Sequence, residues 1–216
     1  MSCPFSSDEG SSEAEVKNRR ADARATACST DTFGDAPPNP HSEYEHATQF
    51  LSNEREKSSI PSVSGEWYYP SPRQFYKSIL LKGHVVDPAD IPTVVSIHNQ
   101  VNEESWKRII KFEKFHENVC KEPKLVRFLG KAGDLSLKAK IRSFAGFGKP
   151  FDRHDWFVDR CGERIKYIVD FYDGLPDPEK PISIFIDARP ELTFSGMLDR
   201  TKLFFRQRLS FWEKRE

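Results

Sequence analysis

The sequence contains no long hydrophobic run. In 216 residues no stretch approaches the roughly eighteen consecutive apolar residues that mark a transmembrane helix. The first residues also include no apolar segment typical of a secretory signal peptide. We therefore expect neither a membrane-spanning segment nor a cleaved secretory leader.

Cysteines are few and irregularly placed. The four are Cys3, Cys28, Cys120 and Cys161, with no CxxC pair and no regular spacing. Zinc knuckles and disulfide scaffolds depend on such patterns, so the sequence predicts neither a zinc knuckle nor a disulfide framework. His116 lies four residues before Cys120, a spacing that could place two metal ligands on one helix face. No second pair is near in sequence, and we expect these two residues to pack or to lie exposed.

Net charge is absent over the whole chain but not within its parts. Lys+Arg and Asp+Glu both total 33, yet residues 1–58 contain 6 basic and 11 acidic residues, which leaves residues 59–216 with 27 and 22. The first segment is rich in Ser, Glu, Asp and Ala, and its composition predicts a disordered acidic arm. We expect residues 59–216 to form one folded domain. Its mild basic excess accompanies no nucleic-acid-binding motif, so we expect no nucleic-acid partner.

Proline and glycine mark the predicted helices in the middle of the chain. Pro72 suits the first turn of a helix that ends near Gly83, and His84 beyond it is expected to be a surface residue. Pro92 suits the start of a second, short helix. The Asn-rich run at 99–102 predicts a break or kink, which would place His98 near a helix end. Another helix is expected from Glu103, with Trp106, Ile109 and Ile110 at helical spacing.

The second half of the chain predicts strands followed by a final helix. Residues 125–129 suit a short strand or a buried turn, and apolar residues alternate over 163–172 and again over 182–187. The two alternating segments are expected to pair as an antiparallel ribbon that ends at Arg189-Pro190. A basic amphipathic helix is predicted from Ser195, and it could cover the sheet or lie on an anionic bilayer. Its apolar face is expected to carry Leu198, Phe205, Leu209 and Trp212. The fold class is therefore α+β, with helices packed on a small antiparallel sheet.

Three segments combine residue types that bind ligands. The first is Trp67-Tyr68-Tyr69-Pro70-Ser71, and the second, His98-Asn99-Gln100-Val101-Asn102-Glu103, places one imidazole among amides. The third runs from Pro150 to Trp156 as Pro-Phe-Asp-Arg-His-Asp-Trp and continues to Asp159-Arg160-Cys161-Gly162. Its ionisable groups must pair if buried, so it is either a hydrogen-bonded structural cluster or part of a cleft. A lone histidine such as His98 is more often structural than a ligand.

These three segments, in this order, resemble the holocytochrome c-type synthases, which are the mitochondrial cytochrome c heme lyases. The resemblance covers about residues 60–212. It implies that His98 is an axial ligand to heme iron, that Trp67 and Tyr69 help to hold the heme, and that His154 corresponds to the family's second invariant histidine. Either Arg153 or Arg160 could clamp a heme propionate, because a guanidinium matches a carboxylate. Cys3-Pro4 has the form of a heme-regulatory dipeptide, although an accidental pair remains the alternative.

The resemblance also implies a reaction, namely the formation of thioether bonds between the heme vinyl groups and the two cysteines of a Cys-x-x-Cys-His segment in apocytochrome c. Heme b would be bound as a substrate, and apocytochrome c1 is a second possible partner. The implied location is the mitochondrial intermembrane space, with peripheral attachment to the inner membrane. The alternative function is a non-catalytic heme carrier or sensor that binds heme through Cys3 and His98, because ligation and catalysis would use the same histidine.

Overall fold

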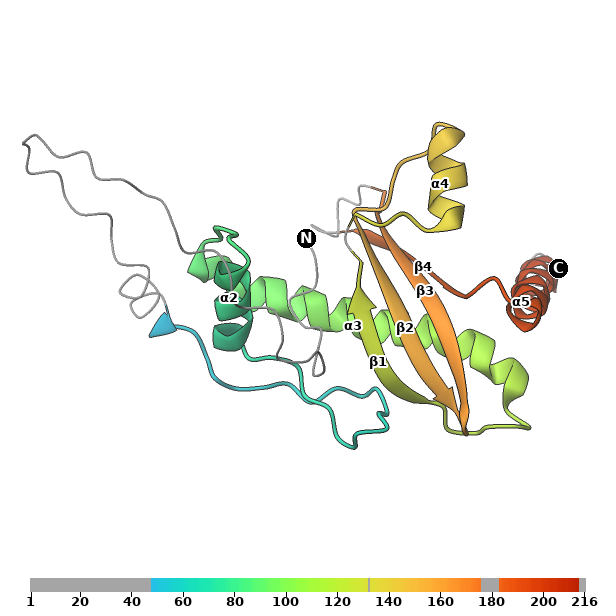
Figure 1. Ribbon diagram of the computed structural model, residues 1–216, viewed down its shortest axis with the longest axis horizontal. Coiled ribbons are helices and arrows are strands. Elements are labelled where there is room, and N and C mark those ends of the chain that lie inside the picture. Colours follow the sequence, from blue (N-terminus) through green and yellow to red (C-terminus); the bar gives the residue numbers. More distant parts are fainter. Residues whose placement is uncertain (1–47, 132, 176–182, 214–216) are drawn as a thin grey trace, which may run out of the picture.

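The computed structural model describes residues 48–131, 133–175 and 183–213, and these residues form an α+β fold, as predicted (Figure 1). Within these described ranges, a four-stranded antiparallel sheet packs with four α-helices and two short 3-10 helices. In chain order the elements are α2 (Pro72–Leu81), η1 (Pro88–Asp90), α3 (Ile91–Glu113), η2 (Lys114–His116), β1 (Lys124–Gly130), α4 (Leu137–Phe144), β2 (Asp152–Arg160), β3 (Glu163–Asp173), β4 (Ile184–Pro190) and α5 (Phe194–Glu213). Among the described residues, no helix has the length and apolar character needed to cross a membrane.

The sheet is a meander in the order β1-β2-β3-β4, with every neighbouring pair antiparallel. A two-residue turn joins β2 to β3, and Arg160 pairs with Glu163 across it. Cys161 and Gly162 in this turn have φ angles of 49° and 102°. Two positive φ angles match the right-handed twist of the flanking strands, so the turn closes a tight hairpin. The predicted ribbon of β3 and β4 is confirmed.

One face of the sheet packs against α3, which crosses it in Figure 1. Trp106 of α3 stacks on Trp156 of β2 with ring centroids 6.5 Å apart, and both are almost fully buried. The alternation of a strand directs His154, Trp156 and Val158 to this face and Arg153 and Asp155 to the other. The main core also contains Ile109 and Phe112 of α3, Leu125 and Phe128 of β1, and Tyr167, Val169, Phe171 and Ile186 of β3 and β4.

Helix α3 is continuous from Ile91 to Glu113, so the predicted break at the Asn-rich run is wrong. Asn99 and Asn102 are 3% and 1% exposed, and each has a side-chain partner. Asn99 Nδ2 donates to Glu56 Oε2 at 2.7 Å, and Asn102 Nδ2 lies 3.3 Å from His98 Nδ1. These contacts offset the low helix propensity of asparagine, because its amide no longer competes for the helix backbone. His98 therefore lies within the helix and not near its end.

Helix α2 begins and ends as its sequence predicts. Ser71 and Gln74 form a reciprocal capping box, and Pro72 occupies the first turn. At the other end, the Gly83 N–H donates to Leu80 O at 2.9 Å and the His84 N–H donates to Ile79 O at 3.2 Å. This is a Schellman motif, which requires a positive φ at the residue after the cap, and Gly83 has a φ of 75°. The motif fixes the backbone of His84 directly beyond the helix.

Part of the expected acidic arm packs on the folded body. Leu51 is 5% exposed and lies in a second core cluster with Phe75 of α2 and Ile91 of α3. Arg55 donates to the backbone carbonyls of Tyr69 and Tyr68 at 3.0 and 2.7 Å. Residues before 59, the expected start of the domain, therefore already pack on the folded domain. Residues 1–47, with the rest of the expected arm, lie outside the described residues.

Cys120 and Cys161 form a disulfide with a Cα–Cα distance of 5.5 Å. The expectation that the cysteines form no disulfide framework is corrected for this pair. The two residues are 41 positions apart, and the turn between β2 and β3 brings Cys161 to the segment that follows α3. His116 Nε2 lies 2.8 Å from Asp199 Oδ2, while Cys120 belongs to the disulfide, so the two residues have separate partners.

Helix α5 contacts β4 and α3 but does not place its predicted apolar face on the sheet. Asp199 is buried and Leu203 packs against the main core. Leu198, Phe205 and Leu209 are 47%, 59% and 65% exposed, and the side chain of Trp212, the fourth predicted member, lies outside the described residues. The residues that touch the body therefore lie on a different side of the helix from the apolar residues that the sequence placed together.

Candidate functional site

A cavity of about 290 Å³ lies between α2, α3 and one end of the sheet. Its walls are mainly apolar, with five polar side chains among them: His84, His98, Asn102, Asp152 and His154. The apolar lining residues are Phe75 and Ile79 of α2, Val85 and Val86 of the following loop, Val94, Ile97 and Val101 of α3, and Phe151, Phe171 and Ile184 at the sheet. An apolar cavity with a few convergent polar groups is the usual form of a small-molecule site.

His98 belongs to the α3 wall of this cavity. Its Nδ1 lies 3.3 Å from the amide of Asn102, one helical turn further on, and its ring meets the ring of Phe75 edge-on at 5.5 Å. Burial lowers the pKa of His98 to about 4, His154 adds to this shift, and Asp152 opposes it. At neutral pH the imidazole is therefore uncharged, which is the form that binds a metal.

His154 reaches the same cavity from β2. It is 2% exposed, and its ring lies between Phe128, stacked at 5.9 Å, and Phe171, edge-on at 5.0 Å. Its Nε2 lies 3.2 Å from Asp152 Oδ2, while its buried Nδ1 has no hydrogen-bond partner in the part of the chain that is described. Buried polar atoms without a hydrogen bond are uncommon in proteins, and a polar group of a bound ligand would supply the missing partner of Nδ1. The structure thus brings together His98 and His154, which belong to separate sequence motifs.

Trp67 and Tyr69 lie beside α3 and are not part of the cavity wall. Tyr69 is 1% exposed, and its hydroxyl donates to Glu103 Oε1 at 3.0 Å. Burial raises the pKa of Tyr69 well above its usual value, so the hydroxyl remains a donor. Trp67 lies 4.7 Å from the Tyr69 ring and 5.7 Å from that of Phe128, which in turn stacks on His154. These two residues therefore support α3 and the His154 wall in this structure.

Glu103 is a residue of this region whose role the sequence did not reveal. Its carboxylate accepts from Ser58 Oγ at 2.7 Å and from the Ser59 N–H at 3.1 Å. Burial would raise the pKa of Glu103, but hydrogen bonds from Ser59, Ser58 and Tyr69 outweigh this effect and lower it. The carboxylate thus ties α3 to the chain before Trp67. The sequence could not indicate this role, because it predicted a break before Glu103. Only a continuous α3 places Glu103 on the side of the helix that faces Tyr69.

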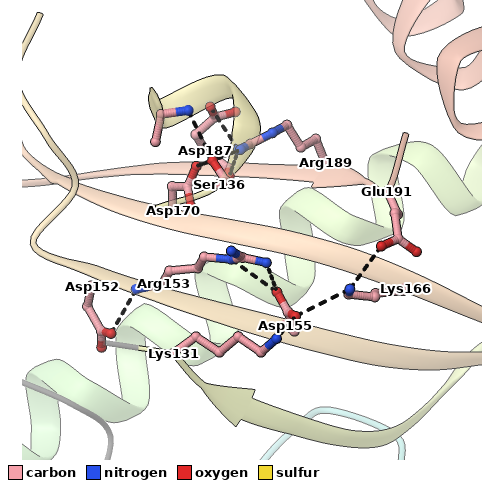
Figure 2. Close-up of polar contacts among 11 residues, drawn as sticks. Lys131, Ser136, Asp152, Arg153, Asp155, Lys166, Asp170, Asp187, Arg189 and Glu191 are labelled. Atoms are coloured by element: carbon pink, nitrogen blue, oxygen red, sulfur yellow. Dashed lines mark hydrogen bonds and ion pairs between the residues drawn. The ribbon is translucent and has the colours of Figure 1, made fainter. Parts of the chain in front are cut away.

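Arg153 lies on the face of the sheet opposite to α3. Its Nη2 is 2.8 Å from Asp155 Oδ1, and Figure 2 shows Lys131 and Lys166 reaching the same carboxylate. Their Nζ atoms lie 3.1 and 3.4 Å from Asp155 Oδ2. Arg153 is therefore part of a charged network on the outer face, and it does not line the cavity.

Arg160 is held by a buried carboxylate at the far end of β2. Its Nε and Nη2 donate to the two oxygens of Glu113 at 2.7 and 3.0 Å, and Tyr167 donates to the same carboxylate at 2.5 Å. The side chains of Arg160 and Glu113 are both 3% exposed. This bidentate pair occupies the guanidinium, and Arg160 is absent from the cavity wall. Cys3 lies outside the described residues.

The cavity brings histidines together, but the described residues do not supply a full set of metal ligands there. Within the described residues, no group of three or more His, Cys, Asp or Glu side chains gathers in a way that could hold a metal ion. A metal at His98 would need further ligands from another molecule, and a porphyrin supplies four in one plane. The apolar walls and the neutral imidazole fit such a planar, largely apolar ligand.

The chain is similar in sequence to a known family and to several known proteins. The chain matches the family described as cytochrome c/c1 heme lyase over residues 1–204. It is 41% identical to a holocytochrome c-type synthase of Gallus gallus over 71% of this chain and 59% of that protein. It is 40% identical to a putative holocytochrome-c1 synthase of Schizosaccharomyces pombe, over 76% of this chain and 80% of that one. It is 35% identical to the holocytochrome-c synthase of Saccharomyces cerevisiae, over 74% and 70%.

The matched region spans about three fifths of the Gallus gallus relative, because 59% of that protein is covered. No solved structure matches the chain.

Proposed function

Because the chain belongs to the cytochrome c/c1 heme lyase family, we propose that it attaches heme covalently to apocytochrome c and binds the heme in the cavity between α2, α3 and the sheet. The observation that carries this proposal is that His98 and His154 line one apolar cavity although they come from separate motifs. Heme b is the substrate, and the protein must bind it, orient it and then release it.

His98 is the proposed axial ligand from this protein. Its neutral imidazole binds iron without first losing a proton, because its pKa is lowered to about 4. The Asn102 amide can present its oxygen to an Nδ1–H after a half-turn of the amide, and this tautomer carries the lone pair on Nε2. A hydrogen bond of this kind orients a ligating histidine and raises its basicity.

The cavity size suits partial enclosure of the heme. At about 290 Å³ it lies near the lower end of the 300–1,000 Å³ or so that enclose small-molecule ligands. Phe75, Val94 and Phe171 can contact the porphyrin faces, while one edge projects from the cavity. We place the vinyl groups at that edge, since the cysteines of the second substrate must reach them.

The reaction requires orientation more than an additional nucleophile. Each substrate thiol adds across a vinyl double bond, so that sulfur bonds to the carbon beside the ring and the thiol hydrogen ends on the terminal carbon. No net oxidation occurs, and the main contribution of the protein is to hold the reacting groups in contact. The histidine of the substrate's Cys-x-x-Cys-His segment takes the iron face opposite His98. Distortion of the macrocycle by the two thioethers weakens the His98 bond and favours release.

The remaining site residues have supporting tasks in this proposal. Nδ1 of His154 has no hydrogen-bond partner among the described residues, and with Nε2 donating to Asp152 it can accept a hydrogen bond from a protonated heme propionate or from a bound water. Trp67 and Tyr69 act through α3 and Phe128, and they hold the heme site in shape without touching the cavity. The contacts of Arg153 and Arg160 support structural tasks, since both guanidiniums are bonded to carboxylates away from the cavity. Heme binding by Cys3 stays a prediction, because Cys3 lies outside the described residues.

The proposed location is the mitochondrial intermembrane space, on the surface of the inner membrane. The exposed apolar residues of α5, which include Phe204 and Phe205, lie beside basic residues such as Lys202 and Arg206. Such a surface can bind anionic lipid without spanning the bilayer. The association should then be reversed by carbonate extraction, and recovery of the protein in the carbonate-resistant pellet would contradict it.

Co-expression with apocytochrome c tests the proposed activity. We expect a heme-staining band at the position of the cytochrome after denaturing electrophoresis, and no such band when both substrate cysteines are replaced by serine. Parallel expression of apocytochrome c1 tests the second substrate. A protein that only carries or senses heme would bind heme and leave the cytochrome unstained, and this result would overturn the proposal.

A further inference from the structure

His84 lines the same cavity as His98 although none of the segments that carry the family resemblance contains it. It follows the Schellman motif at the end of α2, where its own N–H donates to Ile79 O at 3.2 Å. This bond fixes the backbone from which the side chain extends. His98 comes from α3, so the two imidazoles approach the cavity from different walls.

The contacts of the other polar lining residues leave His84 as the candidate for a second iron ligand. His154 is 2% exposed, its ring is packed between two phenyl rings, and its Nε2 faces Asp152. Asn102 is 1% exposed and faces His98. His84 is exposed, and the next residue, Val85, is 97% exposed. Its side chain can therefore move without breaking core packing.

We propose that His84 is a displaceable second axial ligand, which binds the heme iron on the face opposite His98 until the histidine of apocytochrome c replaces it. This inference rests on the proposed function and deepens it. The chemistry is the exchange of one neutral imidazole for another at the same coordination position, so no oxidant or reductant takes part. The histidine of the substrate competes well with His84 for the iron, because the thiols of the same segment contact the vinyl groups and hold that histidine nearby.

The proposed ligand has a purpose in the resting complex. A heme held by His98 alone leaves one iron face open to oxygen and water. Two axial imidazoles close both faces, and a ligand from an exposed position can leave at little cost in burial. The heme would thus be low-spin both before and after the substrate binds. His84 would be the second ligand before binding, and the histidine of the substrate would be the second ligand afterwards.

The test is the visible and electron paramagnetic resonance spectrum of the ferric heme complex of the full chain, purified without apocytochrome. We expect a low-spin bis-histidine spectrum for the wild type. His84→Ala should keep its heme content within about twofold and change to a high-spin spectrum, and added imidazole should restore the low-spin form. His116→Gln is the matched control, because His116 pairs with Asp199 and does not line the cavity; it should remain low-spin.

A His84→Ala complex that keeps the wild-type low-spin spectrum would overturn the inference, as would a wild-type spectrum with thiolate character. His98→Ala in the same experiment separates the two proposals. If His98→Ala loses its heme while His84→Ala is unchanged, the heme site stands and the role of His84 is wrong. If the low-spin complex survives His98→Ala, the proposed heme site and the role of His84 both fail.

Discussion

The side-chain amide of Asn102 lies 3.3 Å from Nδ1 of His98, one helical turn away on α3. Asn102 is only 1% exposed, so its amide is shielded from water, and its contact with Nδ1 helps to orient the imidazole. A buried asparagine inside a helix is unfavourable by propensity, so its contact with His98 is a reason for its presence there.

Replacing Asn102 should weaken heme binding through His98. We expect Asn102→Leu to reduce heme affinity by about 10- to 100-fold, the usual effect of removing a hydrogen-bond partner from a ligating histidine. Titration of the purified apoprotein with heme gives the affinity. Gln100→Ala is the control, because Gln100 is an exposed residue of the same helix that contacts Ser96. Equal affinities of the two variants would show that Asn102 does not orient the ligand.

The lowered pKa of His98 predicts a pH-dependent stability of the apoprotein. The ordinary pKa is 6.5 and the folded value is about 4, so between these values the unfolded chain binds more protons than the folded one. Stability should therefore fall as the pH decreases from about 6.5 towards 4. The contribution is roughly 3 kcal/mol, from about 1.4 kcal/mol per pKa unit.

Denaturant unfolding at pH 7 and at pH 4 measures this effect. The wild type should lose roughly 3 kcal/mol more than His98→Gln over that interval, because the variant lacks the titrating group. Both proteins retain His154 and Asp152, whose side chains also line the cavity beside this position. Equal losses would mean that His98 is not held neutral by its surroundings.

The buried Arg160 and Glu113 pair predicts a large stability effect and a small heme effect. Arg160→Ala leaves the Glu113 carboxylate buried with Tyr167 as its remaining described partner, at a cost of about 3–5 kcal/mol. The double variant Arg160→Met with Glu113→Met should lose less than the single variant, since no unpaired charge remains. Denaturant unfolding measures both, and heme titration of the folded fraction shows whether Arg160 also binds heme. Normal stability with lost heme affinity would favour the propionate clamp.

The Cys120–Cys161 disulfide should contribute measurably to stability. Its sequence separation of 41 corresponds to about 4 kcal/mol of chain entropy in the unfolded state. Cys161→Ser should lower the free energy of unfolding by about 2–4 kcal/mol, and a reductant should have the same effect on the wild type alone. Peptide mapping under non-reducing conditions should recover the linked pair. Its absence from the oxidised protein would contradict the bond.

The sequence predicted elements that depend on local patterns. The alternation in β3 and β4 was readable because one face of each strand packs on the core, and α2 was readable from its proline start and glycine end. The break predicted in α3 failed for a reason outside the local sequence: Glu56 and His98 provide the partners that keep Asn99 and Asn102 in the helix.

Only part of the candidate site could be predicted, because the sequence shows local motifs but not which of them meet in the fold. The motifs identified His98 and His154, but only the fold shows that they line one cavity and that His84 joins them. Arg153 is adjacent to His154 in sequence, yet the alternation of β2 turns it to the opposite face, into the network of Figure 2. This alternation could not be recognised in the sequence. Charged residues of β2 lie on both faces and form buried ion pairs, so apolar and polar residues do not alternate along the strand.

The visible spectrum and heme content of purified His98→Ala, with His154→Ala as the comparison, test the central proposal most directly. We expect His98→Ala to lose bound heme and to form no holocytochrome c on co-expression. His154→Ala should retain some heme with the wild-type ligand signature, because His154 supports the cavity without binding iron. If His98→Ala keeps wild-type heme content and activity while His154→Ala loses both, the axial ligand has been assigned to the wrong histidine.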